Sequence, residues 1–261
     1  MFPQRFSAAA VADAFATLTA LIYARAEADS VYRAITRAAV DLVDGCDHAS
    51  LLLRHDHGYT SVAAVDDVAR RVDAIEVEVD EGPCVDATTD DAYQHDKDLT
   101  VGETPWPAFR ERVLAETPVR SAMAYRLLVD GEKVAALNLF SDTPGGLSGD
   151  SVDQGAVLAA FASVALATLD ARDEADTLRS GLQSNREIGK AVGLLMAAHR
   201  VSSEEAFDIL RRTSQDLNVK LATVADEVVQ GQENQLSTPG TSVRTRIPRP
   251  IEASDADPAL P

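Results

Sequence analysis

The sequence has few cysteines, few aromatic residues and far fewer basic than acidic groups. Its 261 residues include only two cysteines, Cys46 and Cys84, which excludes a disulfide framework and is typical of a reducing compartment. No stretch approaches the ~20 apolar residues that a helix needs to span a bilayer. We therefore predict a cytoplasmic protein without a membrane partner.

The deficit of positive charge is unevenly distributed. The formal net charge is −18, and residues 1–183 hold 15 basic and 31 acidic groups, whereas residues 184–230 hold 6 and 7. A nucleic acid that approaches this chain experiences long-range repulsion, which argues against nonspecific nucleic-acid binding. Any contact with RNA must therefore be local and specific for shape.

Motifs that carry catalysis or metal binding are missing. The sequence contains no Ser-His-Asp order with an elbow motif, no glycine loop that cradles phosphate and no zinc-finger spacing. The histidines His48, His55, His57 and His95 have acidic neighbours, but no third ligand is implied, and 55–58 resembles a hairpin loop. We predict no catalytic residue, no metal site and no enzyme activity.

The N-terminal apolar run Ala14–Ala24 allows two interpretations. A secretory signal would look similar, but Asp13 interrupts the run. Helical spacing instead marks one apolar face, formed by Val11, Phe15, Leu18 and Ile22. We predict an amphipathic helix at 9–27, within an N-terminal segment 1–27, and a second helix at 30–44.

The next part of the chain has the pattern of an antiparallel sheet. Strands are predicted where apolar and β-branched residues cluster, at 49–54, 60–65, 121–129 and 133–140. The last two flank Asp130-Gly131, a strong hairpin signal. Ile75, Val77 and Val79 alternate with acids and predict a further strand. With a long helix from about Asp150, the pattern indicates an α+β fold, a sheet framed by helices.

Three segments of this part resemble a GAF sensor domain. They are Asp80–Ala87 (DEGPCVDA), Trp106–Phe109 (WPAF) and Ala136–Ser141 (ALNLFS), and the resemblance covers about residues 28–170. It implies a pocket over the sheet for a small molecule, cyclic nucleotide or chromophore, although many relatives serve only as dimer scaffolds. The ligand and any cofactor remain unknown. Candidate pocket residues are Glu81, Cys84, Trp106, Tyr125 and Asn138.

Cys84 is the candidate for thiol chemistry, because it follows a Gly-Pro turn where its thiol could face a pocket. The alternative is a small buried apolar residue, the usual environment of free cysteine. Its neighbours Asp80, Glu81 and Asp86 are acidic and would raise the thiol pKa, which predicts an unreactive thiol.

Residues 185–229 have the pattern of three short helices. Ser202 and Glu205 form a capping box at the start of the second helix. Asn218 is predicted as the N-cap of the third helix. The apolar positions include Ile188, Val192, Leu195, Ala206, Phe207, Leu210, Leu221, Val224, Ala225 and Val228.

The residue types in these helices resemble the ANTAR domain of transcription antitermination regulators over about 45 residues. The resemblance implies a dimer that binds a pair of RNA stem-loops and so blocks a terminator. Candidate RNA-binding residues at 185–230 are Arg186, Lys190, Arg211, Arg212, Ser214, Asn218 and Lys220. The alternative for the basic residues is a solvated helix face that balances nearby acids.

The sequence departs from the ANTAR pattern at its lysine. The family usually has Gln-Ala-Lys-Gly where this chain has Lys-Ala-Val-Gly at 190–193, so Lys190 lies two positions early, about 200° around the helix. Ala197, Ala198 and Ala222 also stand where members often carry charge. The resemblance therefore leaves open a degenerate module that contacts only proteins.

A helical linker is predicted at 171–184. Leu158, Ala162, Ala165 and Leu169, then Ala175, Leu178 and Leu182, form a seam suited to a homodimer. The alternative buries the first half of this helix against the sheet. Residues 231–261 are rich in Gly, Ser, Thr and Pro and are predicted to be a disordered tail.

These features together predict a signal-responsive RNA-binding antiterminator controlled by its sensor domain. The alternatives are a thiol-based reductase or redox sensor that uses Cys84, and the protein-contact module.

Overall fold

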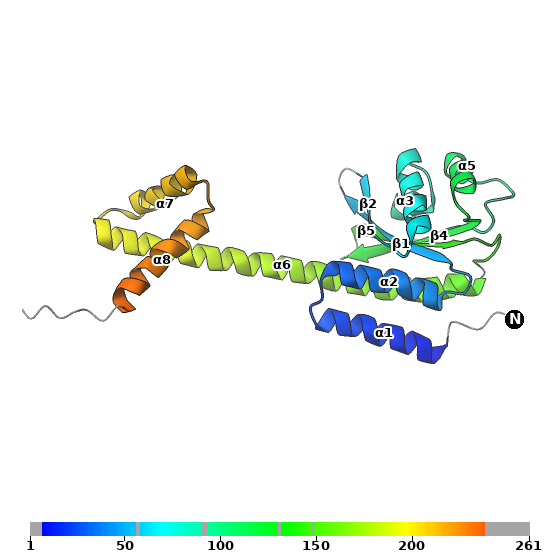
Figure 1. Cartoon of the computed structure of the whole chain (residues 1–261), viewed down its shortest axis with the longest axis horizontal. Helices are drawn as coiled ribbons and strands as arrows, with labels where there is room; N and C mark the ends of the chain where they lie inside the picture. Colours follow the sequence, from blue (N-terminus) through cyan, green and yellow to red (C-terminus); the bar gives the residue numbers. More distant parts are fainter. Residues whose placement is uncertain (1–6, 56–57, 90–92, 130–131, 148, 238–261) are drawn as a thin grey trace, which may run out of the picture. The chain divides into compact units, whose positions relative to one another are not determined.

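The computed structural model describes residues 7–55, 58–89, 93–129, 132–147 and 149–237. The chain forms two compact units, Met1–Asp176 and Thr177–Pro261 (Figure 1).

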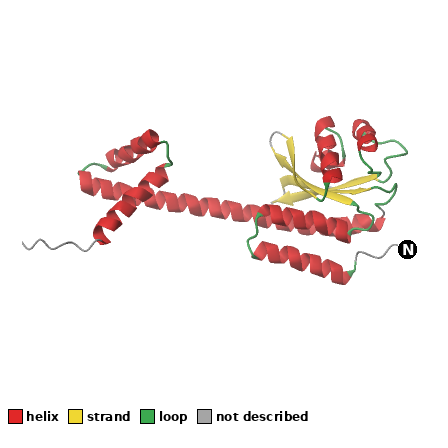
Figure 2. Cartoon of the chain, in the orientation of Figure 1, coloured by secondary structure: helices red, strands yellow, loops and turns green. Residues whose placement is uncertain are grey.

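The first unit is an α+β domain, as predicted. Its sheet has the strand order β2-β1-β5-β4-β3, and all neighbouring strands are antiparallel. Helices cover both faces of the sheet (Figure 2). The elements are α1 (Ala8–Tyr23), α2 (Ala28–Leu42), β1 (His48–His55), β2 (Gly58–Ala64), α3 (Asp67–Val79), α4 (Pro83–Thr89), β3 (Tyr93–Asp96), α5 (Pro107–Glu116), β4 (Ser121–Val129), β5 (Glu132–Ser141) and the first part of α6 (Gly149–His199).

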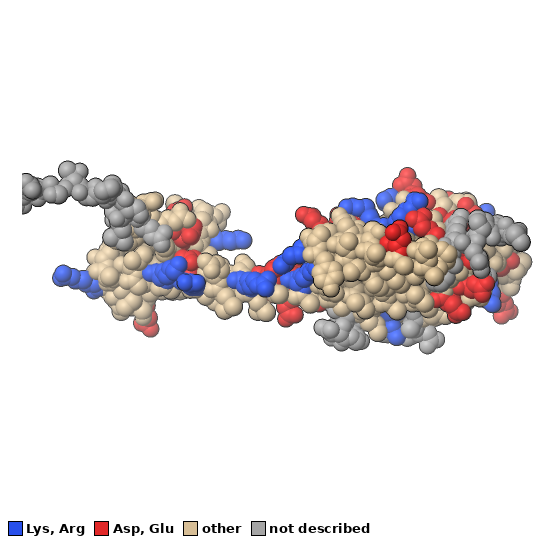
Figure 3. All heavy atoms as spheres, turned by 90° about the horizontal axis from the view of Figure 1, so that it is seen from below, with Lys and Arg blue, Asp and Glu red and all other residues tan. Residues whose placement is uncertain are grey.

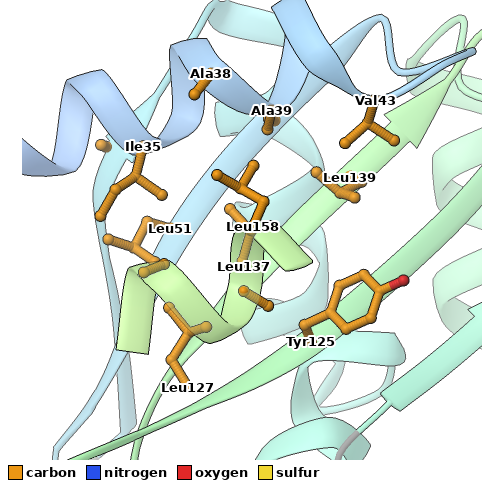
Figure 4. Close-up of a cluster of buried hydrophobic side chains, with 14 of the residues drawn as sticks. Ile35, Ala38, Ala39, Val43, Leu51, Tyr125, Leu127, Leu137, Leu139 and Leu158 are labelled. Atoms are coloured by element: carbon orange, nitrogen blue, oxygen red, sulfur yellow. The ribbon is translucent and has the colours of Figure 1, made fainter. Parts of the chain in front are cut away.

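The alternation of side chains along the strands divides the core into two layers. On one face, Leu51 and Leu137 pack with Ile35 of α2 and Leu158 of α6 (Figure 4). Each such leucine stabilises the fold by about 1.5–3 kcal/mol through removal of apolar surface from water. On the other face, Phe140 packs with residues of α3 and α5. The hairpin of β4 and β5 lies where predicted, and Asp130-Gly131 lies outside the described residues.

Helix α1 confirms the predicted amphipathic face. Ser7 accepts a hydrogen bond from the backbone N–H of Ala10 at 3.1 Å and so begins the helix. Leu18 is buried, and Phe15 stacks on Phe161 of α6 with a centroid separation of 4.4 Å. The apolar run at the N-terminus thus completes the core of this unit.

The strand predicted from Ile75, Val77 and Val79 is wrong, because these residues belong to helix α3. Asp66 caps the helix by accepting from the N–H of Ala69 at 2.9 Å. In the helix the consecutive residues Ile75 and Glu76 are both buried and Val77 is 44% exposed, a pattern that the alternating faces of a strand would not give. The alternation of acids and apolar residues was misleading because the buried face of α3 includes the carboxyl group of Glu76.

Helix α6 is continuous over 51 residues, and its first part is a core helix. Leu158, Ala162 and Ala165 of the predicted dimer seam are buried against the sheet layer of their own unit, which is the alternative interpretation. Among the described residues α6 alone has an 18-residue window long and apolar enough to cross a membrane, contrary to the sequence-based expectation, and 39% of that window is buried inside the protein. Core burial of residues such as Leu158 and Ala162 accounts for part of this apolar composition.

The second unit contains the end of α6, α7 (Ser203–Leu217) and α8 (Leu221–Ser237) around a small core. Its buried residues are Ala191, Leu210, Val224, Ala225 and Val229. The capping box is confirmed, since Ser202 Oγ accepts from the Glu205 N–H at 3.2 Å and the Glu205 carboxylate accepts from the Ser202 N–H at 2.9 Å.

Three details of this unit differ from the prediction. Asn218 is the C-cap of α7, with a left-handed φ of 52°, and not the N-cap of α8. Phe207 is 40% exposed rather than buried. Helix α8 continues to Ser237, beyond the predicted boundary at 230, and residues 238–261 lie outside the described residues.

Candidate functional site

The candidate pocket residues of the first unit do not converge on one cavity. Cys84 of α4 and Asn138 of β5 come together near α3, on the sheet face that carries Leu52 and Ala136. Cys84 is fully buried. Burial first, and then the charges of Glu76 and Asp73, raise the pKa of its thiol well above the usual value, although a hydrogen bond from Asn138 acts the other way. The predicted direction of this shift is right, but its main cause is burial.

A buried polar network surrounds these two residues. Asp73 accepts hydrogen bonds from Ser50 Oγ and Ser61 Oγ, both at 2.5 Å, and from Asn138 Nδ2 at 3.2 Å. Burial nevertheless raises the pKa of Asp73 to about 7. Glu76 accepts from the Cys84 N–H at 2.9 Å, and burial, reinforced by the charges of Asp73 and Asp86, raises its pKa well above its usual value. This network favours protonated carboxyls and a protonated thiol.

Glu81 and Trp106 serve the local structure of α5. The Glu81 carboxylate accepts from the N–H groups of Ala108 at 2.8 Å and Phe109 at 3.4 Å, at the N-terminal end of the helix. Trp106 Nε1 donates to Asp86 at 2.7 Å. Both side chains therefore connect α5 to the α4 segment.

Tyr125 lies on the opposite face of the sheet from Cys84 and Asn138. Its ring belongs to the cluster shared with α2 and α6 (Figure 4). Its hydroxyl donates to the backbone carbonyl of Val152 in α6 at 2.6 Å. Consecutive strand residues face opposite sides, so Tyr125 and its partner Leu137 share one face while Asn138 takes the other.

The best-defined histidine, His48, lies between two carboxylates. His48 Nδ1 lies 2.6 Å from Asp66 and its Nε2 lies 3.1 Å from Asp142. Burial lowers the His48 pKa, but the two carboxylates outweigh burial and raise it overall. Within the described part of the chain, no three His, Cys, Asp or Glu side chains are arranged to hold a metal ion; His57 lies outside that part.

The basic residues of the second unit differ in their partners. Lys190 pairs with Glu187 at 2.9 Å, and Arg211 pairs with Asp208 at 2.8 Å. Arg186, Arg212 and Lys220 form no salt bridge with any described residue. Figure 3 shows basic side chains at several places on this unit and along the adjacent part of α6.

Ser214 and Asn218 build the turn between α7 and α8. Ser214 Oγ donates to the carbonyl of Val219 at 2.6 Å, and the Asn218 N–H returns to the last turn of α7. The pair positions Lys220, which directly precedes α8. Phe207 is a surface residue that was not among the predicted RNA-binding residues, although its spacing of four from Arg211 places both on one side of α7.

Models of two domain families match the chain on these two units. The GAF domain model matches residues 25–167, and the ANTAR domain model matches residues 176–229. The chain is a GAF-family protein with an ANTAR domain. Both predicted resemblances are thereby confirmed. A GAF sensor domain joined to an ANTAR domain is the architecture of a signal-regulated ANTAR regulator.

Solved structures similar to this chain include several GAF domains. One is the GAF domain of a phosphoenolpyruvate-protein phosphotransferase from Coxiella burnetii, with 15% identity, a TM-score of 0.49, and coverage of 62% of this chain and 95% of that chain. The phycocyanobilin-bound GAF domain of a cyanobacterial phytochrome has 15% identity, a TM-score of 0.49, and coverage of 61% and 95%.

A free methionine-R-sulfoxide reductase from Neisseria meningitidis, solved with its substrate, is 11% identical, with a TM-score of 0.46 and coverage of 66% of this chain and 99% of that chain. No curated protein sequence matches the chain. These likenesses identify neither a ligand nor an activity of this GAF-ANTAR protein.

Proposed function

We propose that this protein is a cytoplasmic transcription antiterminator that binds paired RNA stem-loops as a homodimer and responds to a signal through its GAF domain. The observation that carries the proposal is the ANTAR match over a three-helix unit whose basic residues lie outside its core. The protein acts by binding, without catalysis.

The RNA-binding face is proposed from helix geometry. Ile188, Ala191 and Leu195 turn toward the core of the ANTAR domain. Arg186 and Lys190 are one turn apart and lie on the opposite side of α6, at 100° per residue. With Arg212 and Lys220 they offer cations to stem-loop phosphates, and exposed Phe207 beside Arg211 offers a surface on which a loop base can stack.

The shifted lysine changes which residues carry the phosphate contacts. Val192 occupies the position of the family's lysine and packs partly buried on the domain core. Lys190 points away from that side and already pairs with Glu187. The proposal therefore assigns the larger contributions to Arg186, Arg212 and Lys220, whose charges no described carboxylate neutralises by a salt bridge.

The proposed dimer contact keeps Leu178 and Leu182 of the predicted seam and replaces the first half of that seam, which is buried in the GAF core. Val157, Val164 and Leu178 are 46%, 62% and 60% exposed and lie at seven-residue intervals. Ala171 continues the interval, and Leu182 is 71% exposed beside Leu178. Apolar residues at this spacing suit a helix that pairs with a second copy.

The test is to purify the full-length chain from cells, sequence the bound RNA and measure affinity for the recovered stem-loop pairs. Enrichment of paired stem-loops next to terminators, lost in a variant with Arg186, Arg212 and Lys220 changed to Ala, supports the proposal. The same RNA recovered with the parent and the variant would contradict the assigned face.

One observation favours the protein-contact alternative. Ile209, Leu217 and Val219 of the ANTAR domain are 38–59% exposed, which is a surface that another protein could cover. Recovery of a protein partner and no enriched RNA would select this alternative. The redox alternative has less support, since Cys84 is fully buried beside carboxyl groups that disfavour its thiolate.

A further inference from the structure

A cavity of about 540 Å³ lies in the GAF unit, away from the Cys84 and Asn138 network. It is lined by the turn between α1 and α2, Tyr32 of α2, the end of β1 and α6 between Leu166 and Asp176. All of these residues belong to the first unit. Pockets of 300–1,000 Å³ are typical of small-molecule sites, so the volume admits a compact ligand.

One side of the cavity carries negative charge that the protein does not neutralise. Asp170 and Asp173 of α6 line the cavity, and neither forms a salt bridge or hydrogen bond with a described residue. Burial, and then the charges of Asp29, Asp170 and Asp173, raise the pKa of Tyr32. The field of the two carboxylates therefore reaches the half-buried Tyr32, whose hydroxyl has no hydrogen-bond partner among the described residues.

Basic groups line the same cavity. The Arg172 guanidinium donates through Nη2 to the carbonyl of Ile22 at the end of α1, while its Nη1 is buried without a hydrogen-bond partner in the described part of the chain. Arg54 donates to the carbonyl of Thr88 only at 3.4 Å. Arg25, by contrast, is already paired with Asp176 at 2.5 Å. The guanidinium groups of Arg172 and Arg54 therefore retain N–H donors for which no described residue provides an acceptor.

The remaining lining is His55 and a set of apolar residues. Leu53 at the end of β1 and Leu166 and Leu169 of α6 line the cavity, together with Ala26 and Ala28. Carboxylates, guanidinium groups and apolar side chains occur together in a space too small for a macromolecule.

We infer that this cavity binds a small zwitterion with an apolar substituent, a ligand of the amino-acid class. Its ammonium group is held by Asp170 and Asp173, its carboxylate by the guanidinium groups of Arg172 and Arg54, and its substituent by the leucines. Charge-assisted hydrogen bonds of this kind are stronger than neutral ones.

The cavity is also suitably placed to receive the signal of the proposed antiterminator, and this step rests on the proposed function. A ligand here contacts α2, β1 and α6 together, and α6 continues without a break into the ANTAR domain. A ligand that binds one arrangement of these elements better than another shifts their populations. RNA affinity and ligand affinity are then coupled reciprocally.

The test uses isothermal calorimetry on the full-length chain with the twenty L-amino acids as probes. At least one amino acid with an apolar side chain should bind. Its N-acetyl derivative lacks the ammonium and its amide lacks the carboxylate, and each should bind at least about tenfold more weakly. Absence of binding by every amino acid, or equal binding of all three forms, would overturn the inference.

Matched variants connect the binding to the cavity. Asp173→Asn should weaken binding of the same amino acid at least about tenfold, because it removes one of the two unpaired carboxylates. Glu174→Gln makes the same charge change at the next exposed position of α6 outside the cavity and should leave binding unchanged. Equal affinities of the two variants would overturn the site.

Because the calorimetry contains no RNA, it tests ligand binding by the cavity independently of the proposed RNA binding. Loss of amino-acid binding with intact RNA binding overturns the cavity as the sensor site. Amino-acid binding by a protein that binds no RNA supports the cavity and overturns the proposed antiterminator.

Discussion

Single buried acids are expected to make the stability of this protein depend on pH. Asp73 has its carboxylate in the core beneath the sheet, held by hydroxyl and amide donors from Ser50, Ser61 and Asn138. Those hydrogen bonds orient the side chain but do not compensate for the loss of hydration of its carboxylate, since the pKa of Asp73 remains raised to about 7. The free energy of folding therefore includes a cost when this group ionises.

We expect this cost to appear in urea unfolding at different pH. A carboxyl with a raised pKa in the folded state contributes stability that is fully present below its unfolded pKa of about 4 and is lost as pH rises toward about 7. Relative to Asp73→Asn, which keeps the shape, the parent should lose on the order of 4 kcal/mol over this range. Asp41→Asn, at an exposed site, should follow the parent; an Asp73→Asn variant that also follows the parent would contradict the assignment.

The two thiols should be unreactive in the folded protein. Both cysteines are fully buried, and burial with the nearby Glu76 and Asp73 carboxyls holds the Cys84 pKa high. An aromatic disulfide reagent should therefore label them only as fast as the protein opens, and labelling should accelerate in urea. Rapid labelling of Cys84 in native buffer, abolished by Cys84→Ser, would instead support a redox sensor.

At the scale of elements, α6 combines two roles along one helix. Its inward stripe, with Leu158 and Ala162, completes the GAF core, while its outward stripe leaves Val157 and Val164 in solvent. The residues of the two stripes are adjacent in the sequence, as with Val157 and Leu158, so the sequence pattern alone did not decide which stripe faces a second copy. Because the inward stripe is buried within the domain, we assign the proposed contact with a second copy to the outward stripe.

We expect the intact chain to sediment as a dimer at micromolar concentration. Leu178→Asp with Leu182→Asp should shift it toward the monomer, because two carboxylates would have to be buried in the proposed seam. Ser180→Asp adds a negative charge at an exposed position of the same helix and serves as the control. A parent that is monomeric, or a double variant that remains fully dimeric, is inconsistent with this seam.

At the scale of the whole molecule, the net charge of −18 repels RNA, so the proposed RNA binding requires a few local cations. Arg186→Ala or Lys220→Ala should weaken binding to a cognate stem-loop pair by about 1–3 kcal/mol and reduce its salt dependence. As a control, Arg33→Ala makes the same change of net charge at an exposed position of α2 in the GAF domain.

Filter binding at several salt concentrations should distinguish the ANTAR variants from the control. Equal losses of affinity would mean that overall charge, and not the proposed RNA-binding face, controls binding.

Much of the fold could be predicted from the sequence, because it depends on interactions between near neighbours. The Ser202 capping box, the β4 and β5 hairpin and the apolar face of α1 each involve residues a few positions apart. Such short-range patterns specify helix starts, turns and faces before any distant contact forms. The GAF and ANTAR resemblances rest on similar local runs of residue types.

The tertiary structure alone decided which side chains meet. Ile75, Val77 and Val79 alternate as in a strand, yet α3 packs on the sheet and buries Glu76. Tyr125 and Asn138 lie on opposite faces of the sheet, so the predicted pocket set does not assemble. The cavity beside Asp170 and Asp173 joins α2 and β1 with a part of α6 that lies more than a hundred residues later in the sequence. Burial and charge compensation depend on such distant neighbours, which a local pattern does not contain.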